Sequence, residues 1–197
     1  MKKTVVLVIL LIFLSNNTYA QLKSINKKQR TLSIHFMLND YRTAHLINNT
    51  SVGEVINDDN FSKFTEMSPG LSISYYKGIS SHVDFMASIG GSYTKYDFKN
   101  NTSGRSDKLL IEADANLNYK LLPDSYRLTP YITTGVGASL YSVHYGAYIP
   151  LGLGLQVRLG EEAFLFSNLQ YRVGISDFTA NHLNYSIGFG APLGLSK

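Results

Sequence analysis

The strongest constraint on this fold is a two-residue repeat of apolar side chains in the C-terminal part of the chain, from Tyr148 to Gly194. Large apolar residues alternate with small or polar ones in three consecutive runs, at 149–159, 165–176 and 183–190. Successive side chains of a β-strand point to opposite faces, so a period of two predicts strands. Only Gly160–Glu162 separates the first two runs, and a three-residue gap containing glycine predicts a hairpin.

The same alternation predicts five earlier strands, which brings the expected number to eight. They lie at 31–38, 69–77, 82–98, 108–122 and 129–142. Residues 39–67 lack sustained alternation and are rich in Asn, Asp, Ser and Thr, so we expect a long first loop there. Longer connections at 39–67, 99–107, 143–147 and 177–181 are expected at one end, and turns at 78–81, 123–128 and 160–162 at the other.

The bulk of the two faces indicates which of them meets the solvent. If the apolar set pointed inward, roughly forty large side chains would have to fit inside a barrel that eight strands make only just wide enough to fill. The opposite face is rich in Gly and poor in Lys, which suits a narrow interior better than a hydrated surface. Apolar outside and polar inside is the pattern required in lipid. The predicted fold is therefore all-β: an eight-stranded antiparallel transmembrane β-barrel of the outer-membrane type.

The N-terminus predicts export. Lys2 and Lys3 precede an apolar run, Val5–Leu14, and a polar stretch ends at Ala20, so residues 1–20 are interpreted as a signal peptide cleaved after Ala20. An uncleaved membrane helix would need around twenty apolar residues. We expect a solvated periplasmic lead at 21–30, the barrel at 31–194 and a tail at 195–197.

Composition excludes several classes of function. Loss of the signal peptide removes two lysines and lowers the formal net charge from +4 to +2, so the basic precursor gives no reason to expect nucleic acid. The chain has no cysteine, which excludes disulfides, thiolate metal sites, a cysteine nucleophile and a lipid-modified cysteine.

An even number of strands returns both ends to the periplasmic side, and an exported chain that spans with strands is expected in a bacterial outer membrane.

Five charged residues of the predicted inward face form the candidate site. We expect a lumen ionic network, structural in role, formed by Glu112, Asp114, Lys120, Arg158 and Arg172. The alternative is that these charges gate a conduit or hold a ligand. Pairing is the favoured interpretation, because charges removed from water must be paired and eight strands leave little lumen.

No catalytic, cofactor or metal site is predicted. A lipid A-modifying enzyme would need a Ser or His nucleophile system with a carboxylate at the lipid boundary. Among the five histidines, only His182 has polar residues nearby in the sequence, namely Asp177 and Asn184. In the first loop His45, Glu54, Asp58 and Asp59 match no known metal-ligand spacing, so they are not expected to bind a metal.

Three glycine-rich runs carry a family resemblance: TPYITTGVGASLY at 129–141, YIPLGLGLQVRLG at 148–160 and LNYSIGFGAPLG at 183–194. They resemble the outer-membrane β-barrel family common in Bacteroidota, related in architecture to OmpA-type and PorT-type barrels. A resemblance to PorT would imply a role in type IX secretion. The sequence departs from OmpA-type proteins in having no peptidoglycan-binding domain before Lys197, and it lacks the C-terminal aromatic residue of many such barrels.

These observations predict a structural or interaction protein of the cell envelope, with the first loop as its contact region. Expected partners are outer-membrane lipids and lipopolysaccharide, with envelope or secretion-complex proteins as candidates. The alternatives are a narrow channel, an accessory barrel of a secretion system and a lipid A-modifying enzyme.

Overall fold

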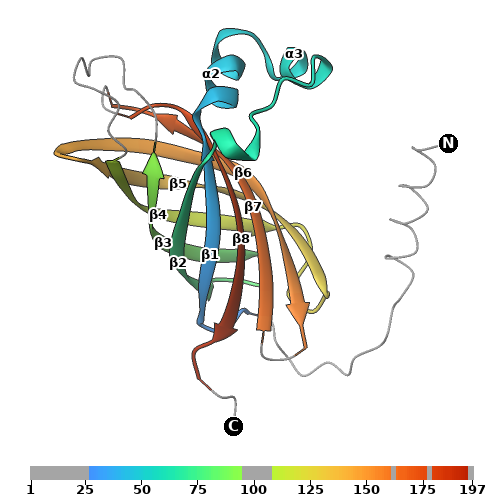
Figure 1. The fold of residues 1–197 in the computed structure, drawn as a ribbon. Helices are drawn as coiled ribbons and strands as arrows, with labels where there is room; N and C mark the ends of the chain where they lie inside the picture. Colours follow the sequence, from blue (N-terminus) through green and yellow to red (C-terminus); the bar gives the residue numbers. More distant parts are fainter. Residues whose placement is uncertain (1–26, 95–107, 161–162, 177–178, 195–197) are drawn as a thin grey trace.

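Eight antiparallel strands close into one barrel in chain order (Figure 1). The computed structural model describes residues 27–94, 108–160, 163–176 and 179–194, so the predicted signal peptide, the 99–107 loop and the 195–197 tail lie outside the described residues. The strands are β1 (Thr31–Asp40), β2 (Ser68–Gly78), β3 (Val83–Thr94), β4 (Lys108–Lys120), β5 (Leu128–Tyr141), β6 (His144–Leu159), β7 (Ala163–Gly174) and β8 (His182–Pro192). The predicted fold class is confirmed.

The first and last strands close the barrel. β1 pairs with β8 along its whole length, from Thr31 opposite Pro192 to Asp40 opposite Leu183. Both strand ends, Thr31 and Pro192, therefore lie at the same end, which we call the inner end. A closed ladder leaves no sheet edge with unpaired backbone groups, which is the condition for spanning a bilayer with strands. Within the described ranges, no helix is long and apolar enough to cross a membrane.

The two faces of the sheet separate as the alternation predicts. On β1, Ile34 is 63% exposed on the outer wall, whereas its neighbour Ser33 is 2% exposed and points into the lumen. Leu153 and Ile187 are exposed on β6 and β8, and Tyr76 and Phe166 are buried inside. The apolar outer wall and the polar lumen expected for a lipid-facing barrel are both present.

Two inward glycines make room for rings on neighbouring strands. Gly137 of β5 is paired with Tyr148 of β6, and Gly154 of β6 is paired with Tyr131 of β5. A Cβ atom at either glycine would overlap the tyrosine ring opposite. The glycine-rich inward face is thus a packing requirement, since each ring lies flat over a residue without a side chain.

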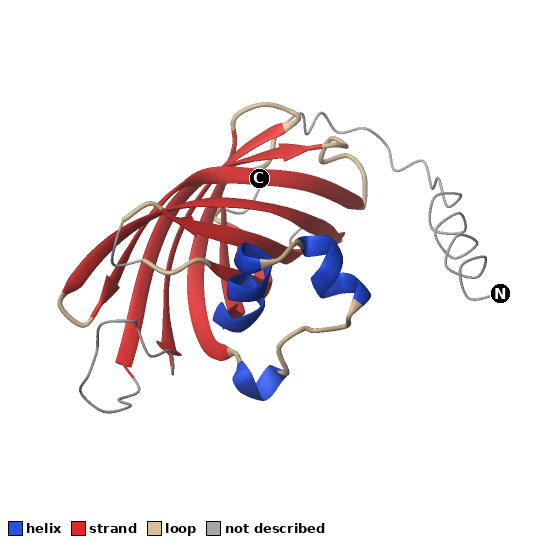
Figure 2. Cartoon of the chain, turned by 90° about the horizontal axis from the view of Figure 1, so that it is seen from above, coloured by secondary structure: helices blue, strands red, loops and turns tan. Residues whose placement is uncertain are grey.

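The long first loop predicted at 39–67 is present between β1 and β2, and it is folded into helices that the sequence analysis did not predict. It contains α2 (Tyr41–Asn49), α3 (Val52–Asn57) and a short 3-10 helix, η1 (Phe64–Glu66). Asp40 caps α2 by accepting a hydrogen bond from Thr43 N at 2.9 Å, and Ser51 caps α3. Asp and Ser are preferred at such positions, a signal that a search for two-residue alternation does not detect. Figure 2 shows the helices gathered at one end, the outer end.

The connection predicted at 143–147 is also wrong. Strands β5 and β6 continue pairing to Tyr141 and His144, so the connection is a two-residue turn at Ser142 and Val143. Ser142 adopts a positive φ of 59°, as a tight hairpin turn requires. The mixed composition of residues 143–147 gave no sign of this tight hairpin.

The solvated lead predicted at 21–30 is wrong at Lys28. This side chain is 5% exposed, because the chain crosses the inner end before β1 and places it inside the barrel. Gly78 N donates to Lys28 O at 3.1 Å, and the absence of a side chain at Gly78 allows this close approach. The neighbouring Lys27 is exposed.

The orientation of the wall can be tested with single cysteines, since the chain has none of its own. In lipid vesicles, a polarity-sensitive label at Leu153→Cys or Ile187→Cys should report a hydrocarbon environment and be quenched by lipid-borne quenchers, because both residues face outward. A third outward position, Ser167→Cys on β7, pairs with Leu155 and Ile187 and should respond in the same way. Quencher-insensitive labels at all three positions would contradict the lipid-facing assignment.

Candidate functional site

Inward side chains fill the lumen in three layers. An ionic cluster lies toward the outer end, a second lies at the inner end, and buried aromatic rings lie between them. We name the outer cluster for Glu112, Asp114, Arg172, His182, Tyr148 and Asn39, and the inner cluster for Lys28, Asp84, Lys120, Asp124 and Gln156. The candidate site is therefore the interior of the barrel together with the loop that covers its outer end.

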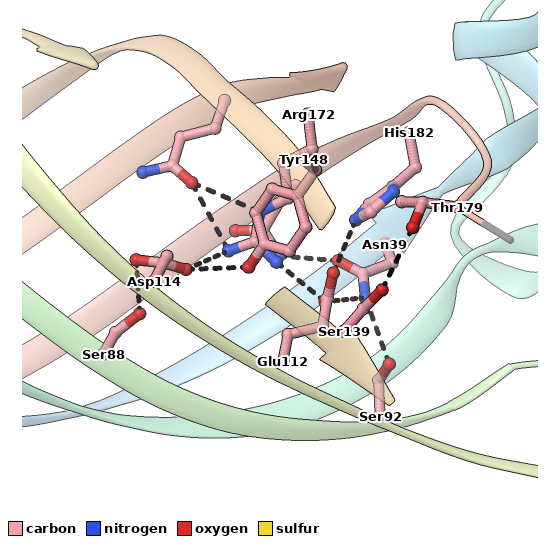
Figure 3. A network of polar contacts seen from close by, with 12 residues as sticks. Asn39, Ser88, Ser92, Glu112, Asp114, Ser139, Tyr148, Arg172, Thr179 and His182 are labelled. Carbon is pink, nitrogen blue, oxygen red and sulfur yellow. Dashed lines mark hydrogen bonds and ion pairs between the residues drawn. The ribbon is translucent and has the colours of Figure 1, made fainter. Parts of the chain in front are cut away.

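One arginine organises the outer cluster (Figure 3). Glu112 and Asp114 are two residues apart on β4, so both carboxylates project from the same face. Arg172 of β7 lies across the lumen from them, with Nη1 2.7 Å from Glu112 Oε2 and Nη2 3.3 Å from Asp114 Oδ2. One guanidinium thus bridges two carboxylates, a geometry that its planar fork favours.

A tyrosine, an asparagine and a histidine complete the outer cluster. Tyr148 donates its hydroxyl to Asp114 Oδ2 at 3.1 Å, and its ring lies 5.1 Å from the guanidinium carbon of Arg172. Asn39 donates to Glu112 Oε2 at 3.3 Å. His182 Nε2 is 3.2 Å from Glu112 Oε1, an ion-pair distance without the alignment of a hydrogen bond. Each charge is thereby surrounded by polar contacts from other strands.

Tyr41, the first residue of α2, covers the outer cluster. The ring of Tyr41 lies 4.9 Å from the ring of His182, and Tyr41 packs with Leu110 and Tyr141 in a small apolar cluster. The helix itself contacts β8. The outer end of the lumen is therefore covered by a folded segment of the chain.

The inner cluster contains two cations and two carboxylates. Lys120 Nζ lies 2.8 Å from Asp84 Oδ1 and also binds Asp124. Lys28 Nζ lies 2.9 Å from Asp84 Oδ2 and donates to Gln156, which in turn donates to Asp124 Oδ1 at 3.1 Å. All five side chains are buried, and the formal charges cancel. Removal from water is tolerable because every charge has a close partner.

Aromatic rings separate the two ionic clusters. Tyr76 and Phe166 stack with centroids 4.3 Å apart and planes within 5° of parallel. His35 lies beside both rings. The ammonium of Lys28 lies 4.9 Å from the centroid of Phe166 and 5.1 Å from that of Tyr76, so the inner cluster is capped by cation–π contacts.

The structure divides the five residues predicted to form one network. It brings together Glu112, Asp114 and Arg172 in the outer cluster and places Lys120 in the inner cluster. Arg158 belongs to neither cluster, because its Nη2 donates to the carbonyl of Ser125 at the inner rim. Alternation alone could not show that β6 reaches the rim at this residue.

Sequence reasoning missed several members of these clusters. The alternation of the predicted 82–98 strand places Asp84 inward without indicating a partner, and Asp124 falls in the predicted 123–128 turn, although both are buried and ion-paired. Lys28 carries no strand signal. The alternation does place His182 inward beside Asn184, but its carboxylate partner, Glu112, comes from β4. The missing information was which strands face one another across the lumen.

The outer loop is attached to the barrel by buried polar contacts. Asp40 Oδ1 accepts hydrogen bonds from Thr43 N at 2.9 Å and from Ser62 Oγ at 2.6 Å. Ser62 N donates to Thr43 Oγ1 at 3.0 Å, which joins the end of the loop to its first helix. At the surface, the backbone N–H of Lys63 and the guanidinium of Arg42 hold the pKa of Glu66 below its ordinary value.

The folded loop exposes an apolar surface. Val52 and Ile56 lie one turn apart on α3 and are 55% and 58% exposed, and Phe61 and Phe64 are exposed farther along the loop. Within the described residues, no group of three or more His, Asp or Glu side chains could hold a metal ion. His45 Nε2 accepts a hydrogen bond from Asn49 Nδ2 at 2.8 Å. The described part of the loop thus presents apolar side chains at the outer end.

Comparison with solved structures identifies the fold. The N-terminal β-barrel domain of Pseudomonas aeruginosa OprF is similar over 83% of this chain and 97% of its own, with a TM-score of 0.50 and 15% identity. Neisserial surface protein A is similar over 83% and 96%, with a TM-score of 0.51 and 12% identity. This chain has the fold of outer-membrane β-barrels. No protein family profile and no curated protein matches the sequence, so the resemblance to the Bacteroidota family stays a prediction.

Removal of one buried cation should destabilise the barrel strongly. In Lys28→Met, Lys120 is the one cation left in the inner cluster to balance two buried carboxylates. We expect this variant to lower the free energy of unfolding by about 3–5 kcal/mol. The control Lys27→Met changes an exposed neighbour and should stay within about 0.5 kcal/mol of the parent. Reversible denaturant unfolding in detergent or lipid measures both. Equal stabilities for the two variants would show that the inner cluster contributes nothing.

Proposed function

We propose that this protein is an integral outer-membrane barrel with a filled lumen, whose first outer loop is a contact surface for another component of the cell envelope. The comparisons support an outer-membrane protein at the level of fold, and the specific role is our inference from the loop and the lumen. The filled lumen would make the barrel an anchor, and the loop would carry the interaction.

The observation that carries this proposal is the folded loop. A segment used merely to connect β1 and β2 needs neither helices nor a buried polar attachment through Asp40 and Ser62. The loop also exposes Val52, Ile56 and Phe64 at the end of the molecule expected to face outward. Apolar side chains gathered on a preformed surface favour binding of a partner, because little conformational freedom is lost on association.

The alternatives receive less support from the same geometry. A channel needs a hydrated path, whereas both ends of this lumen hold buried ion pairs. A lipid-modifying enzyme needs its reactive groups at the lipid boundary, whereas His182 is 1% exposed and faces the lumen. An accessory barrel of a secretion system is a more specific form of our proposal, with the loop contacting a subunit of that system.

Conductance in planar bilayers tests the filled lumen. The purified protein should give no reproducible open steps, because paired charges and stacked rings occupy the lumen. A variant combining Lys28→Ala with Arg172→Ala should leak small ions, since it removes large side chains from both clusters. Arg158→Ala is the matched control, because Arg158 lies outside both clusters. Regular open steps from the unaltered protein that change in Arg172→Ala would establish a channel instead.

Site-specific photocrosslinking in cells tests the loop. A photoreactive residue at Phe64 or Ile56 should give a discrete adduct with another envelope component, and Val52→Ser combined with Ile56→Ser should remove it. Tyr126, 50% exposed at the inner end, is the control position and should not give that adduct. The Ser variants lie outside the barrel wall, so thermal unfolding should be unchanged. If the loop positions give no adduct, or the same adduct as Tyr126, the contact role fails.

A further inference from the structure

The described part of the inner rim exposes several cations. In the described ranges, the exposed or half-buried charged side chains at this end are all cations: Lys27, Arg30, Lys77, Arg127 and Arg158. Its two carboxylates, Asp84 and Asp124, are buried and already paired with Lys28 and Lys120. The rim therefore has cations without carboxylate partners among the described residues.

Four of these cations are arranged as two cross-strand pairs. Arg127 and Arg158 extend the β5–β6 register by one position, and Arg158 N donates to Arg127 O at 2.8 Å. Arg30 and Lys77 each follow the last β1–β2 pair, Thr31 opposite Tyr76, by one residue. Like charges placed opposite each other destabilise a sheet unless an anion lies between them.

The outer end differs in its charge balance. The described part of the first loop exposes Arg42 and Lys63 against a larger number of carboxylates: Glu54, Asp58, Asp59 and Glu66. Arg42 is also paired with Glu66 at 2.9 Å. The cationic pairs are thus a property of one rim rather than of the whole surface, although the chain's overall charge is small.

The surroundings of the Arg30–Lys77 pair identify the anion. Lys77 continues the outward set of β2 beyond Ile73 and Tyr75, so it leaves the apolar wall at its inner boundary. Ile79, Tyr126 and Leu193 are exposed at the same end. Cations that follow an apolar wall and lie beside exposed apolar side chains are placed at the level of lipid headgroups, where long basic side chains reach phosphate.

We propose, resting on the outer-membrane assignment proposed above, that the inner rim binds the phosphate groups of anionic phospholipids in the inner leaflet at Arg30 and Lys77. The pair presents two cationic groups from adjacent strands, and guanidinium matches phosphate through two parallel hydrogen bonds. Binding would relieve the repulsion within the pair and hold the barrel at a fixed depth.

Native mass spectrometry of the mature protein released from nanodiscs tests this proposal. From an equal mixture of phosphatidylglycerol and phosphatidylcholine, the protein should retain phosphatidylglycerol preferentially, by roughly fivefold for each cation engaged. Arg30→Gln with Lys77→Gln should lose that preference, whereas Arg127→Gln with Arg158→Gln changes two cations of the same rim that continue the inward set and should keep it. Arg42→Gln with Lys63→Gln changes two cations at the outer end and is the matched control, expected to keep it.

Arg30→Lys preserves charge and should keep most of the preference, which separates loss of binding from loss of folding. Inorganic phosphate should not displace retained phosphatidylglycerol at millimolar concentration, because the headgroup is held together with its acyl chains. The proposal is overturned if the unaltered protein shows no preference, if either control variant loses as much as Arg30→Gln with Lys77→Gln, or if free phosphate displaces the lipid.

Discussion

The constraint on which this structure depends is that lipid offers no hydrogen bonds. A chain that crosses a bilayer with strands must close its ladder, here between β1 and β8, and must turn its apolar side chains outward. The polar half of every strand is then confined to one narrow interior. All charges placed there have to be neutralised by other charges in the same space, since neither water nor lipid can do it.

The lumen meets this requirement with two separate clusters. β4 contributes to both, with Glu112 and Asp114 toward the outer end and Lys120 at the inner end. A shift of β4 against its neighbours would therefore break ion pairs at both ends at once. Buried ion pairs are weak evidence of net stability, but loss of one partner is costly, so such pairs discriminate against wrong registers. Tyr131 and Tyr148 pack on glycines of the adjacent strand and reinforce the same register.

The sequence was sufficient for the wall of the barrel and insufficient for its contents. A period of two is a local property, so Ile34 and Leu153 could be assigned outward and Glu112 and Arg172 inward without knowledge of the tertiary structure. The grouping of Lys120 with Asp84 and Lys28 depends on which strands meet across the lumen, which no local pattern encodes. The loop helices were missed for a different reason: their signal is a pair of capping residues, Asp40 and Ser51, in a segment of polar composition.

The origin of Lys28 has a consequence for biogenesis. Its partners come from β3 and β6, whereas Lys28 itself precedes the first strand. A nascent barrel that has not yet received this segment holds an uncompensated carboxylate at its inner end. A residue that precedes the first strand therefore completes the charge balance of the inner cluster.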